Sequence, residues 1–322
     1  MTLLPPRPAI VTVTLNPAID QTLSIPGFAA GQVNRVAESR SDPGGKGVNV
    51  ASCLSDLGLE VVATGFLGAE NATLFEKLFE RKRITDRFVR LAGSTRVGLK
   101  IVDDRAWQTT DINFPGLTPR EQDLAELLER IASLAASGGW FVLSGSVPPG
   151  VPDDIYVPLI ESIHARGARV VLDTSGRALR QALAGRPEVV KPNAEELGEL
   201  AGGALDGPGA VLEAARSLLE RGVRRVVVSL GGDGAVFVER GLESDQALLA
   251  RPPQVTVRST VGAGDAMVAG IVAAAIEDRS LEETARTATA CGALAVTRIG
   301  AGIEDLAELR ALSEEVEIES LS

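Results

Sequence analysis

The sequence contains few aromatic residues, two cysteines and one histidine, and each of these scarcities excludes some chemistry. Aromatic residues make up 3% of the 322 residues, so the core must be aliphatic and rich in alanine. His164 falls late in a predicted surface helix, which disfavours Ser-His-Asp, Cys-His and histidine–zinc chemistries together. Cys53 and Cys291 lie far apart and match no metal-binding or redox spacing, so we expect reduced thiols in the core.

Long hydrophobic runs and an excess of basic residues are also absent. No stretch of about 18 apolar residues occurs, and Met1–Pro6 has no charged region followed by an apolar one, so we expect a cytoplasmic protein. The formal net charge of −11 argues against nucleic acid and against an anionic membrane as partners. With 45% apolar and 23% charged residues, the composition supports a sizeable core and excludes global disorder.

Short apolar runs alternate with helical patterns along most of the chain. The predicted strands are Ile10–Leu15, Val61–Phe66, Phe141–Leu143, Arg169–Leu172, Val189–Val190 and Arg225–Leu230. The predicted helices are Gly47–Leu57, Ala72–Arg81, Thr118–Ser137 with Thr118 as its cap, Pro152–Arg166, one from Ala194, Gly209–Arg221, Ala266–Ala275 and one capped by Ser280. Continuous apolar strands alternating with helices predict a parallel sheet that helices cover on both faces.

Two regions depart from this rhythm. Val97–Val102 and Gln108–Asn113 alternate polar and apolar residues around the polar turn Asp103-Asp104-Arg105, which predicts a hairpin. Gln21–Ser41 has no helical period and is rich in turn residues. We therefore expect a small antiparallel sheet inserted into a larger α/β body, as a lid formed by segments at roughly 17–42 and 92–115, within one domain that spans residues 1–322.

The stretch Ser259–Asp265 is a glycine-rich turn that leads into the apolar helix at Ala266–Ala275. Glycines permit close backbone approach, and the free N–H groups of a helix's first turn form an anion site. Two interpretations of Asp265 are open at this point. It is either an acidic helix cap or a general base beside a pocket for a transferring phosphate.

A second glycine turn, Gly44-Gly45-Lys46-Gly47, precedes Asn49. It is not a P-loop, because glycine follows the lysine, and the dinucleotide fingerprint is absent. Because ligands of such sheets bind beyond the carboxyl ends of the strands, the polar turns that follow the predicted strands are candidate ligand contacts. These turns are Asn16–Asp20, Ser144–Ser146, Asp173–Gly176, Lys191–Asn193 and Gly231–Gly234.

Taken together, the motifs resemble those of the ribokinase-like (PfkB) sugar kinases, over about residues 10–305. The motifs that carry the resemblance are Asn16-Pro17-Ala18-Ile19-Asp20, Gly44–Asn49, Thr95-Arg96, Ser144-Gly145-Ser146, Lys191–Glu196, Ser229-Leu230-Gly231 and Gly262–Asp265. The Asn-Pro-Ala-x-Asp opening and the lysine in the glycine loop favour the branch of 1-phosphofructokinases and tagatose-6-phosphate kinases. The resemblance implies a three-layer α/β/α domain with a mostly parallel central sheet and a small β-sheet lid, through which two copies pair into a homodimer.

The resemblance also implies ATP-dependent phosphorylation of a sugar phosphate, with Mg²⁺. Asp265 would be the general base, and the backbone of Gly262, Ala263 and Gly264 the anion hole for the transferred phosphoryl group. The acceptor side would comprise Asp20, Gly44, Gly45, Lys46, Asn49, Arg96, Ser144 and Arg35, with Asp20 and Asn49 on sugar hydroxyls and Lys46 and Arg96 on the existing phosphate. The ATP side would comprise Lys191, Asn193, Glu196, Ser229, Gly231, Gly234, Thr260 and Gly264, with Glu196 holding Mg²⁺ through water.

We expect fructose 1-phosphate as the acceptor, with tagatose 6-phosphate or fructose 6-phosphate as the alternative substrates. Ala266 departs from the serine that many relatives have after the aspartate, but this hydroxyl is not the base, so activity should survive. The low aromatic content suggests that aliphatic residues enclose the adenine. A binding protein that has lost the chemistry is disfavoured by the intact motifs, and a nicotinamide-dependent oxidoreductase by the missing fingerprint.

Overall fold

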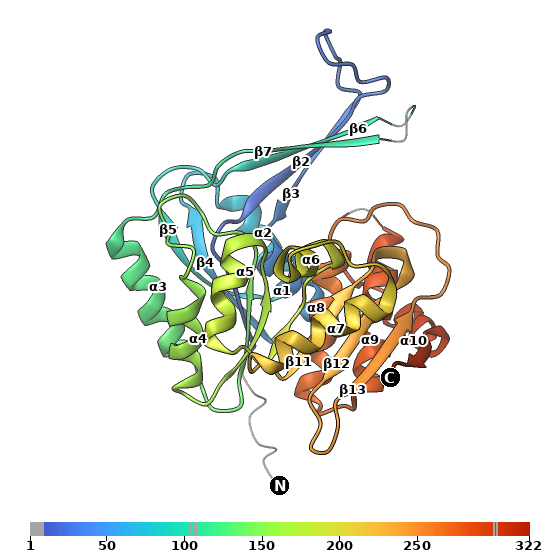
Figure 1. Ribbon diagram of the computed structural model, residues 1–322. Coiled ribbons are helices and arrows are strands. Elements are labelled where there is room, and N and C mark those ends of the chain that lie inside the picture. The colour runs from blue at the N-terminus through green and yellow to red at the C-terminus, as the bar shows by residue number, and fades with distance from the viewer. Residues whose placement is uncertain (1–9, 104, 106–107, 299, 301) are drawn as a thin grey trace, which may run out of the picture.

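The structure is a computed structural model that describes residues 10–103, 105, 108–298, 300 and 302–322. Within these residues, the larger of two sheets has ten strands in the spatial order β14-β13-β12-β11-β10-β9-β8-β1-β4-β5 (Figure 1). In chain order these strands are β1 (Ile10–Thr14), β4 (Val61–Gly68), β5 (Thr85–Leu91), β8 (Trp140–Ser144), β9 (Arg169–Asp173), β10 (Val189–Val190), β11 (Arg225–Ser229), β12 (Ala235–Glu239), β13 (Gln246–Arg251) and β14 (Glu317–Ser320). All neighbours from β11 to β5 pair in parallel and those from β11 to β14 antiparallel, so the predicted mostly parallel sheet is confirmed.

Helices cover both faces of the large sheet and create two hydrophobic clusters. One cluster contains apolar residues of α1 (Lys46–Asp56), α2 (Thr73–Lys82), α8 (Ala263–Ile276), α9 (Leu281–Val296) and α10 (Leu306–Glu315). The other contains residues of α3 (Glu121–Leu134), α4 (Tyr156–His164), α5 (Gly176–Ala182), α6 (Ala194–Ala201) and α7 (Gly207–Glu220). Strand residues alternate between the clusters, and both consist mainly of aliphatic side chains and alanine, as the composition predicts.

The smaller sheet projects from this body, with the loop between β2 and β3 at its far end (Figure 1). It has the order β3-β2-β6-β7, formed by β2 (Ala18–Ser24), β3 (Glu38–Gly44), β6 (Val97–Asp103) and β7 (Gln108–Asn113). The predicted hairpin is confirmed as β6 and β7, which pair antiparallel, although Asp104 in its turn lies outside the described residues. The sheet is not wholly antiparallel as expected, because β2 and β6 come from separate chain segments and pair in parallel.

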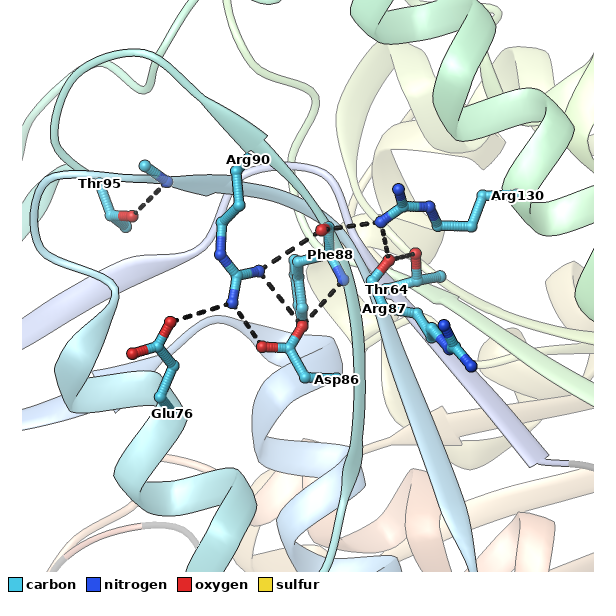
Figure 2. Close-up of polar contacts among 9 residues, drawn as sticks. Thr64, Glu76, Asp86, Arg87, Phe88, Arg90, Thr95 and Arg130 are labelled. Carbon is cyan, nitrogen blue, oxygen red and sulfur yellow. Dashed lines mark hydrogen bonds and ion pairs between the residues drawn. The ribbon is translucent and has the colours of Figure 1, made fainter.

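The outer backbone groups of the edge strand β5 bind side chains and not another strand of the sheet (Figure 2). The backbone N–H of Phe88 donates to Asp86 Oδ1 at 2.9 Å, and its carbonyl accepts from Arg130 Nη1 at 2.8 Å. Arg90 also points at this carbonyl and forms ion pairs with Asp86 and Glu76. The outward polar groups of Phe88, in the middle of this edge strand, are therefore occupied and not open to a strand of another chain.

Several predicted boundaries move in the structure. The cap of α3 is Arg120 and not Thr118, because Arg120 has extended backbone and its backbone N–H and guanidinium both donate to the Asp123 carboxylate. The elements missed by sequence reasoning are β5, η1 (Leu183–Gly185), η2 (Gly231–Asp233), α5, β12, β13, α10 and β14. Most of them are short or alternating, so their sequence signal is weak. The predicted cap at Ser280 is confirmed, while Met1–Pro6 lies outside the described residues.

The strand register brings three polar residues into one row at the carboxyl edge of the sheet. Thr14 on β1 is opposite Ser144 on β8, which is opposite Asp173 on β9. Lys191 follows the end of β10, where its backbone N–H donates to Leu172 O at 3.0 Å. Since parallel strands end at the same edge, residues that are far apart in the sequence meet here.

Candidate active site

The glycine turn delivers Asp265 to the first turn of α8 without using it as a cap. Gly262 is the N-cap and has a φ of 84°, a left-handed conformation that favours glycine. Asp265 is the third helical residue, only 7% exposed, and its carboxylate makes no capping hydrogen bond. The carboxylate is therefore not used to satisfy the helix end, and the interpretation of Asp265 as an acidic cap is wrong.

Asp265 instead faces Asn49, which projects from the first turns of α1. Asn49 Nδ2 donates to Asp265 Oδ2 at 2.8 Å, and both side chains are buried. Burial and the nearby Asp173 carboxylate raise the pKa of Asp265 from its ordinary 3.8 to about 6, although the Asn49 hydrogen bond, Lys46 and Lys191 oppose this change. A carboxylate with this pKa is ionised near neutral pH and still binds a proton readily, as a general base must.

Two lysines converge on one buried carboxylate beside Asp265. Lys46 Nζ donates to Asp173 Oδ1 at 2.9 Å, and Lys191 Nζ lies 3.4 Å from the same oxygen. Burial acts to lower the pKa of Lys46, but attraction and hydrogen bonding to Asp173 outweigh it, so that the pKa of Lys46 is raised. A Cβ added at Gly264 would lie 3.5 Å from Lys191 Nζ, so this ammonium group faces the glycine turn. The arrangement concentrates two cations where a phosphate would meet Asp265.

The glycine loop before α1 approaches the sheet so closely that side chains are excluded. A Cβ added at Gly47 would lie 2.3 Å from Thr14 Oγ1 and 3.1 Å from Ser144 Oγ. Gly45 is the N-cap of α1 with a φ of 111°, and a Cβ on it would lie 3.0 Å from the Pro17 backbone. These contacts explain why the turn around Lys46 requires glycine.

Ser144 does not reach the open part of this site. Its side chain is fully buried under the glycine loop, and its hydroxyl has no partner among the described residues. Ser146 is the exposed serine of this turn and accepts a hydrogen bond from Asn16 Nδ2 at 3.1 Å. The exposed serine of this turn is therefore Ser146, and the assignment of Ser144 to the substrate stays a prediction.

The predicted acceptor-side residues Asp20 and Arg96 lie near the junction with the small sheet. Asp20 forms an ion pair with Lys100 Nζ at 2.9 Å and packs over Gly44, where an added Cβ would lie 2.7 Å from its carboxylate. Arg96 donates to the carbonyls of Asn16 and Phe114 at 3.4 and 3.3 Å. Burial lowers the pKa of Arg96, with Asp20 opposing the change. Asp20 is thus the carboxylate whose negative charge favours the protonated form of Arg96.

Two of the predicted cations, Arg96 and Arg35, do not contact Lys46 among the described residues. Lys46 and Arg96 make no contact with each other among the described residues, because Lys46 turns towards Asp173 while Arg96 turns towards Asn16 and Phe114. Arg35 is exposed in the loop that joins β2 to β3, at the end of the small sheet remote from the body (Figure 1). In the described residues, the cations that the resemblance assigned to one substrate phosphate thus have different partners.

The glycines predicted for the ATP side line a cavity of about 500 Å³, which reaches Gly264, the residue before Asp265 in the chain. The predicted residues that line it are Ser229, Gly231, Gly234, Thr260, Ala263 and Gly264. Its apolar wall includes Val255, Val257, Met267, Ala293 and Val296, and no aromatic residue is among its described lining residues. Its volume is in the range typical of small-molecule sites, and its walls are aliphatic as the composition suggested.

Asn193 and Glu196 form the capping box of α6. Asn193 Oδ1 accepts from the Glu196 N–H at 2.7 Å, and Glu196 Oε2 accepts from the Asn193 N–H at 2.8 Å. The Asn193 backbone also bridges to Ser229, which connects this turn to the cavity. The structural interpretation of the motif is confirmed, and the second oxygen of Glu196 makes no hydrogen bond among the described residues.

A metal ion at this site would have few protein ligands. The described residues contain no cluster of three or more His, Cys, Asp or Glu that could hold one. The free oxygen of Glu196 fits Mg²⁺, which keeps several waters and binds through one or two carboxylates together with phosphate oxygens.

His164 is not part of this site, because its Nε2 pairs with Glu188 at 3.1 Å. No helix in the described part of the chain is long and apolar enough to cross a membrane.

The structure adds two charged residues that sequence reasoning did not select. Asp173 belongs to a polar turn recognised after a predicted strand, but the sequence does not show that Lys46 and Lys191 point at it. Lys100 has polar and apolar neighbours typical of a strand, so nothing marks it as the partner of Asp20. Lysine is rare in this chain, and three of its five lysines lie at this site, which is a signal that could have identified Lys100.

Comparisons with known proteins agree with this geometry. The family model described as pfkB family carbohydrate kinase matches residues 11–307. The 1-phosphofructokinase of Rhodobacter capsulatus is 49% identical over 313 residues, 97% of this chain and 98% of that protein. The 1-phosphofructokinase of Xanthomonas campestris is 48% identical over 285 residues, 87% of this chain and 88% of that protein. The solved structure of phosphofructokinase-2 from Escherichia coli in complex with substrates and products is 31% identical, with a TM-score of 0.89 over 95% of this chain and 99% of that chain.

Proposed function

Since this chain belongs to the pfkB family of carbohydrate kinases, we propose that it phosphorylates the C6 hydroxyl of fructose 1-phosphate with ATP, giving fructose 1,6-bisphosphate and ADP. The observation that carries the proposal is the buried Asp265 carboxylate, held by Asn49 at the first turn of α8 and next to two lysines. The 1-phosphofructokinase relatives, 49% and 48% identical over most of the chain, support the choice of acceptor.

In the proposed reaction, Asp265 takes the proton of the C6 hydroxyl as its oxygen attacks the γ-phosphorus of ATP. The new bond forms between this oxygen and phosphorus, the bond from the γ-phosphorus to the β–γ bridging oxygen breaks, and ADP leaves with the electron pair. The N–H groups of the turn at Gly262–Gly264 and the ammonium groups of Lys46 and Lys191 stabilise the charge of the phosphoryl oxygens. Phosphoryl transfer depends mainly on such positioning and charge stabilisation.

The acceptor is proposed to lie between the carboxyl edge of the sheet and the small sheet. Asp20 and Asn49 would bind sugar hydroxyls, and Arg96 would bind the 1-phosphate through its planar guanidinium group. Asn49 then has two roles, because it also orients Asp265 at 2.8 Å. We keep Arg35 as a cation that would reach the acceptor only by movement of the small sheet or from a second copy of the chain.

The adenine of ATP is proposed to occupy the aliphatic cavity at Ser229, Gly231 and Gly234. Its phosphates would then extend past Gly264 towards Lys191. Glu196, next to Asn193, is the residue that would hold Mg²⁺ through water, and the ion would neutralise phosphate charge when bound. The cytoplasmic location expected from the sequence stays a prediction.

A homodimer through the small sheet is part of the proposal. The sheet and its connecting loop carry exposed apolar side chains that a second copy would bury: Val33, Val36, Ile112 and Phe114. The test is the mass of the protein in solution by light scattering, for the native chain and for a Phe114→Ser variant. A native chain that stays monomeric at all concentrations would contradict the dimer.

A substrate panel tests the proposed activity. The values of kcat/KM are measured with ATP and fructose 1-phosphate, fructose 6-phosphate or tagatose 6-phosphate, and we expect fructose 1-phosphate to give the highest value. A higher value with either 6-phosphate would reject the assigned acceptor, and no turnover with any of the three would reject the proposed kinase activity itself.

A further inference from the structure

Asp173 occupies a central position for which the proposed reaction gives it no role. It is the last residue of β9 and 1% exposed, and Lys46 and Lys191 approach the same oxygen, Oδ1, at 2.9 and 3.4 Å. Lys46 is the first residue of α1, in the glycine loop that the resemblance assigns to the acceptor, whereas Lys191 follows β10, in the turn that it assigns to ATP. One carboxylate therefore joins cations from the two halves of the site.

The charged groups around Asp173 are mostly withdrawn from solvent, because the side chains of Asp173 and Lys191 are 1% and 5% exposed, whereas that of Lys46 is 36% exposed. Asp173 and Asp265 are two buried carboxylates near each other, and Lys46 and Lys191 are the two cations that offset them. Removing one partner of a buried ion pair leaves an uncompensated charge, so the four groups depend on one another. A lysine side chain has many rotamers, and an anchored ammonium group loses this freedom before the substrate binds rather than during binding.

We propose that Asp173 is a positioning residue that holds Lys46 and Lys191 as one phosphate-binding unit and so couples the acceptor side of the site to the ATP side. This inference rests on the proposed function, since it assumes that both lysines face the phosphoryl group in transfer. Asp173 does not contact the reacting atoms in this arrangement. It acts by fixing the two ammonium groups and by its charge on Asp265.

The coupling has a consequence for the pH dependence of the reaction. The charged or titratable groups that face Asp173 or its lysines come from five elements: Lys46 on α1, Lys191 after β10, Asp265 on α8, Tyr156 on α4 and Glu196 on α6. Asp173 raises the pKa of Asp265 by repulsion between like charges. An uncharged residue at position 173 therefore moves the acid limb of the activity profile to lower pH.

The test is Asp173→Asn, which keeps the shape and removes the charge. We expect the KM values for ATP and for fructose 1-phosphate to rise together by about tenfold each, the loss of about one charged hydrogen bond, while the acid limb moves to lower pH. Asp56→Asn is the matched control, because Asp56 and Lys82 form another largely buried carboxylate–lysine pair outside the proposed site. This control should lower the melting temperature and leave both KM values unchanged.

Double-mutant cycles test whether the three residues act as a unit. Lys46→Met and Lys191→Met, each combined with Asp173→Asn, should have a combined effect on ATP binding smaller than the product of the single effects. Binding of a nonhydrolysable ATP analogue, measured by calorimetry, gives this readout without turnover, so that it separates failure of the coupling from failure of the proposed kinase activity.

Three results would overturn the inference. The first is independent, multiplicative effects in both cycles. The second is an Asp173→Asn variant that changes only the Mg²⁺ concentration needed for half-maximal activity, since the carboxylate would then act through the metal. If the Asp173→Asn variant does not fold, Lys191→Met decides the question: it must weaken binding of fructose 1-phosphate as well as of the ATP analogue, and unchanged binding of fructose 1-phosphate refutes the coupling.

Discussion

Replacement of Asp265 by asparagine should abolish most of the activity and at the same time stabilise the fold. A pKa of about 6 in place of the ordinary 3.8 means that the folded state resists ionisation of this carboxyl group. The difference of about two units, at about 1.4 kcal/mol a unit, corresponds to about 3 kcal/mol of unfolding free energy lost once the group is ionised. Asparagine carries no charge and can still accept the hydrogen bond from Asn49.

The sign of the pH dependence follows from the raised pKa. The native state binds the proton of Asp265 more tightly than the unfolded chain does, so native stability from this group is present at low pH and is lost as pH rises through about 6. The gain from Asp265→Asn should therefore be about 3 kcal/mol near pH 8 and about 0.5 kcal/mol near pH 4. Loss of general-base catalysis should lower kcat by roughly 10²–10⁴.

Urea unfolding at both pH values, followed by circular dichroism, measures the stability, and a coupled assay for ADP measures kcat. Glu213→Gln serves as the control, since it removes the charge of an exposed carboxylate on α7 that does not line the cavity. A variant that is less stable than the native chain near pH 8, or a gain that is the same at both pH values, would refute the electrostatic reasoning. An unchanged kcat would remove Asp265 from its role as base.

Three further substitutions test other parts of the site. Arg96→Met should raise the KM for fructose 1-phosphate by roughly 10- to 100-fold, because a charged hydrogen bond is lost, and should change the KM for ATP little. Steady-state kinetics that show equal changes in both KM values would contradict the place of Arg96 on the acceptor side. Gly264→Ala should fold, because the new Cβ would lie 3.5 Å from Lys191 Nζ, yet should lower kcat by filling the phosphate position; a fully active variant with an unchanged melting temperature argues against the anion hole. Asn193→Ala should cost about 1 kcal/mol in urea unfolding through loss of the α6 cap, and a change below a few tenths would contradict the importance of this cap.

Some helices and strands could be predicted from the sequence, and others could not. Continuous apolar strands such as β11 and amphipathic helices such as α7 are encoded locally, so their existence follows from the sequence pattern. The start of α3 was wrong by sequence, because Thr118-Pro119 suggests a cap as well as Arg120 does, and only the packed chain selects between them. Strands β12 and β13 were missed although β12 is as long and as buried as β11; they form an antiparallel hairpin inside the sheet, between β11 and β14.

Part of the candidate site could likewise be predicted from the sequence. The glycine turn before Asp265, the glycine loop around Lys46 and the capping box at Asn193 are local motifs, and the sequence alone determined them. It also determined that the core is aliphatic, because aromatic residues are 3% of the chain. These features depend on backbone conformation and composition, which neighbouring residues largely specify.

Only the tertiary structure decided which side chains meet. The parallel register placed Thr14, Ser144 and Asp173 in one row, buried Ser144 under the glycine loop and turned Lys46 and Lys191 towards one oxygen of Asp173. It also gave Lys46 and Arg96 different partners and left Arg35 in the loop between β2 and β3. The physical reason is that a side chain's direction and burial follow from the packing of strands and helices distant in the sequence, and no local pattern encodes that packing.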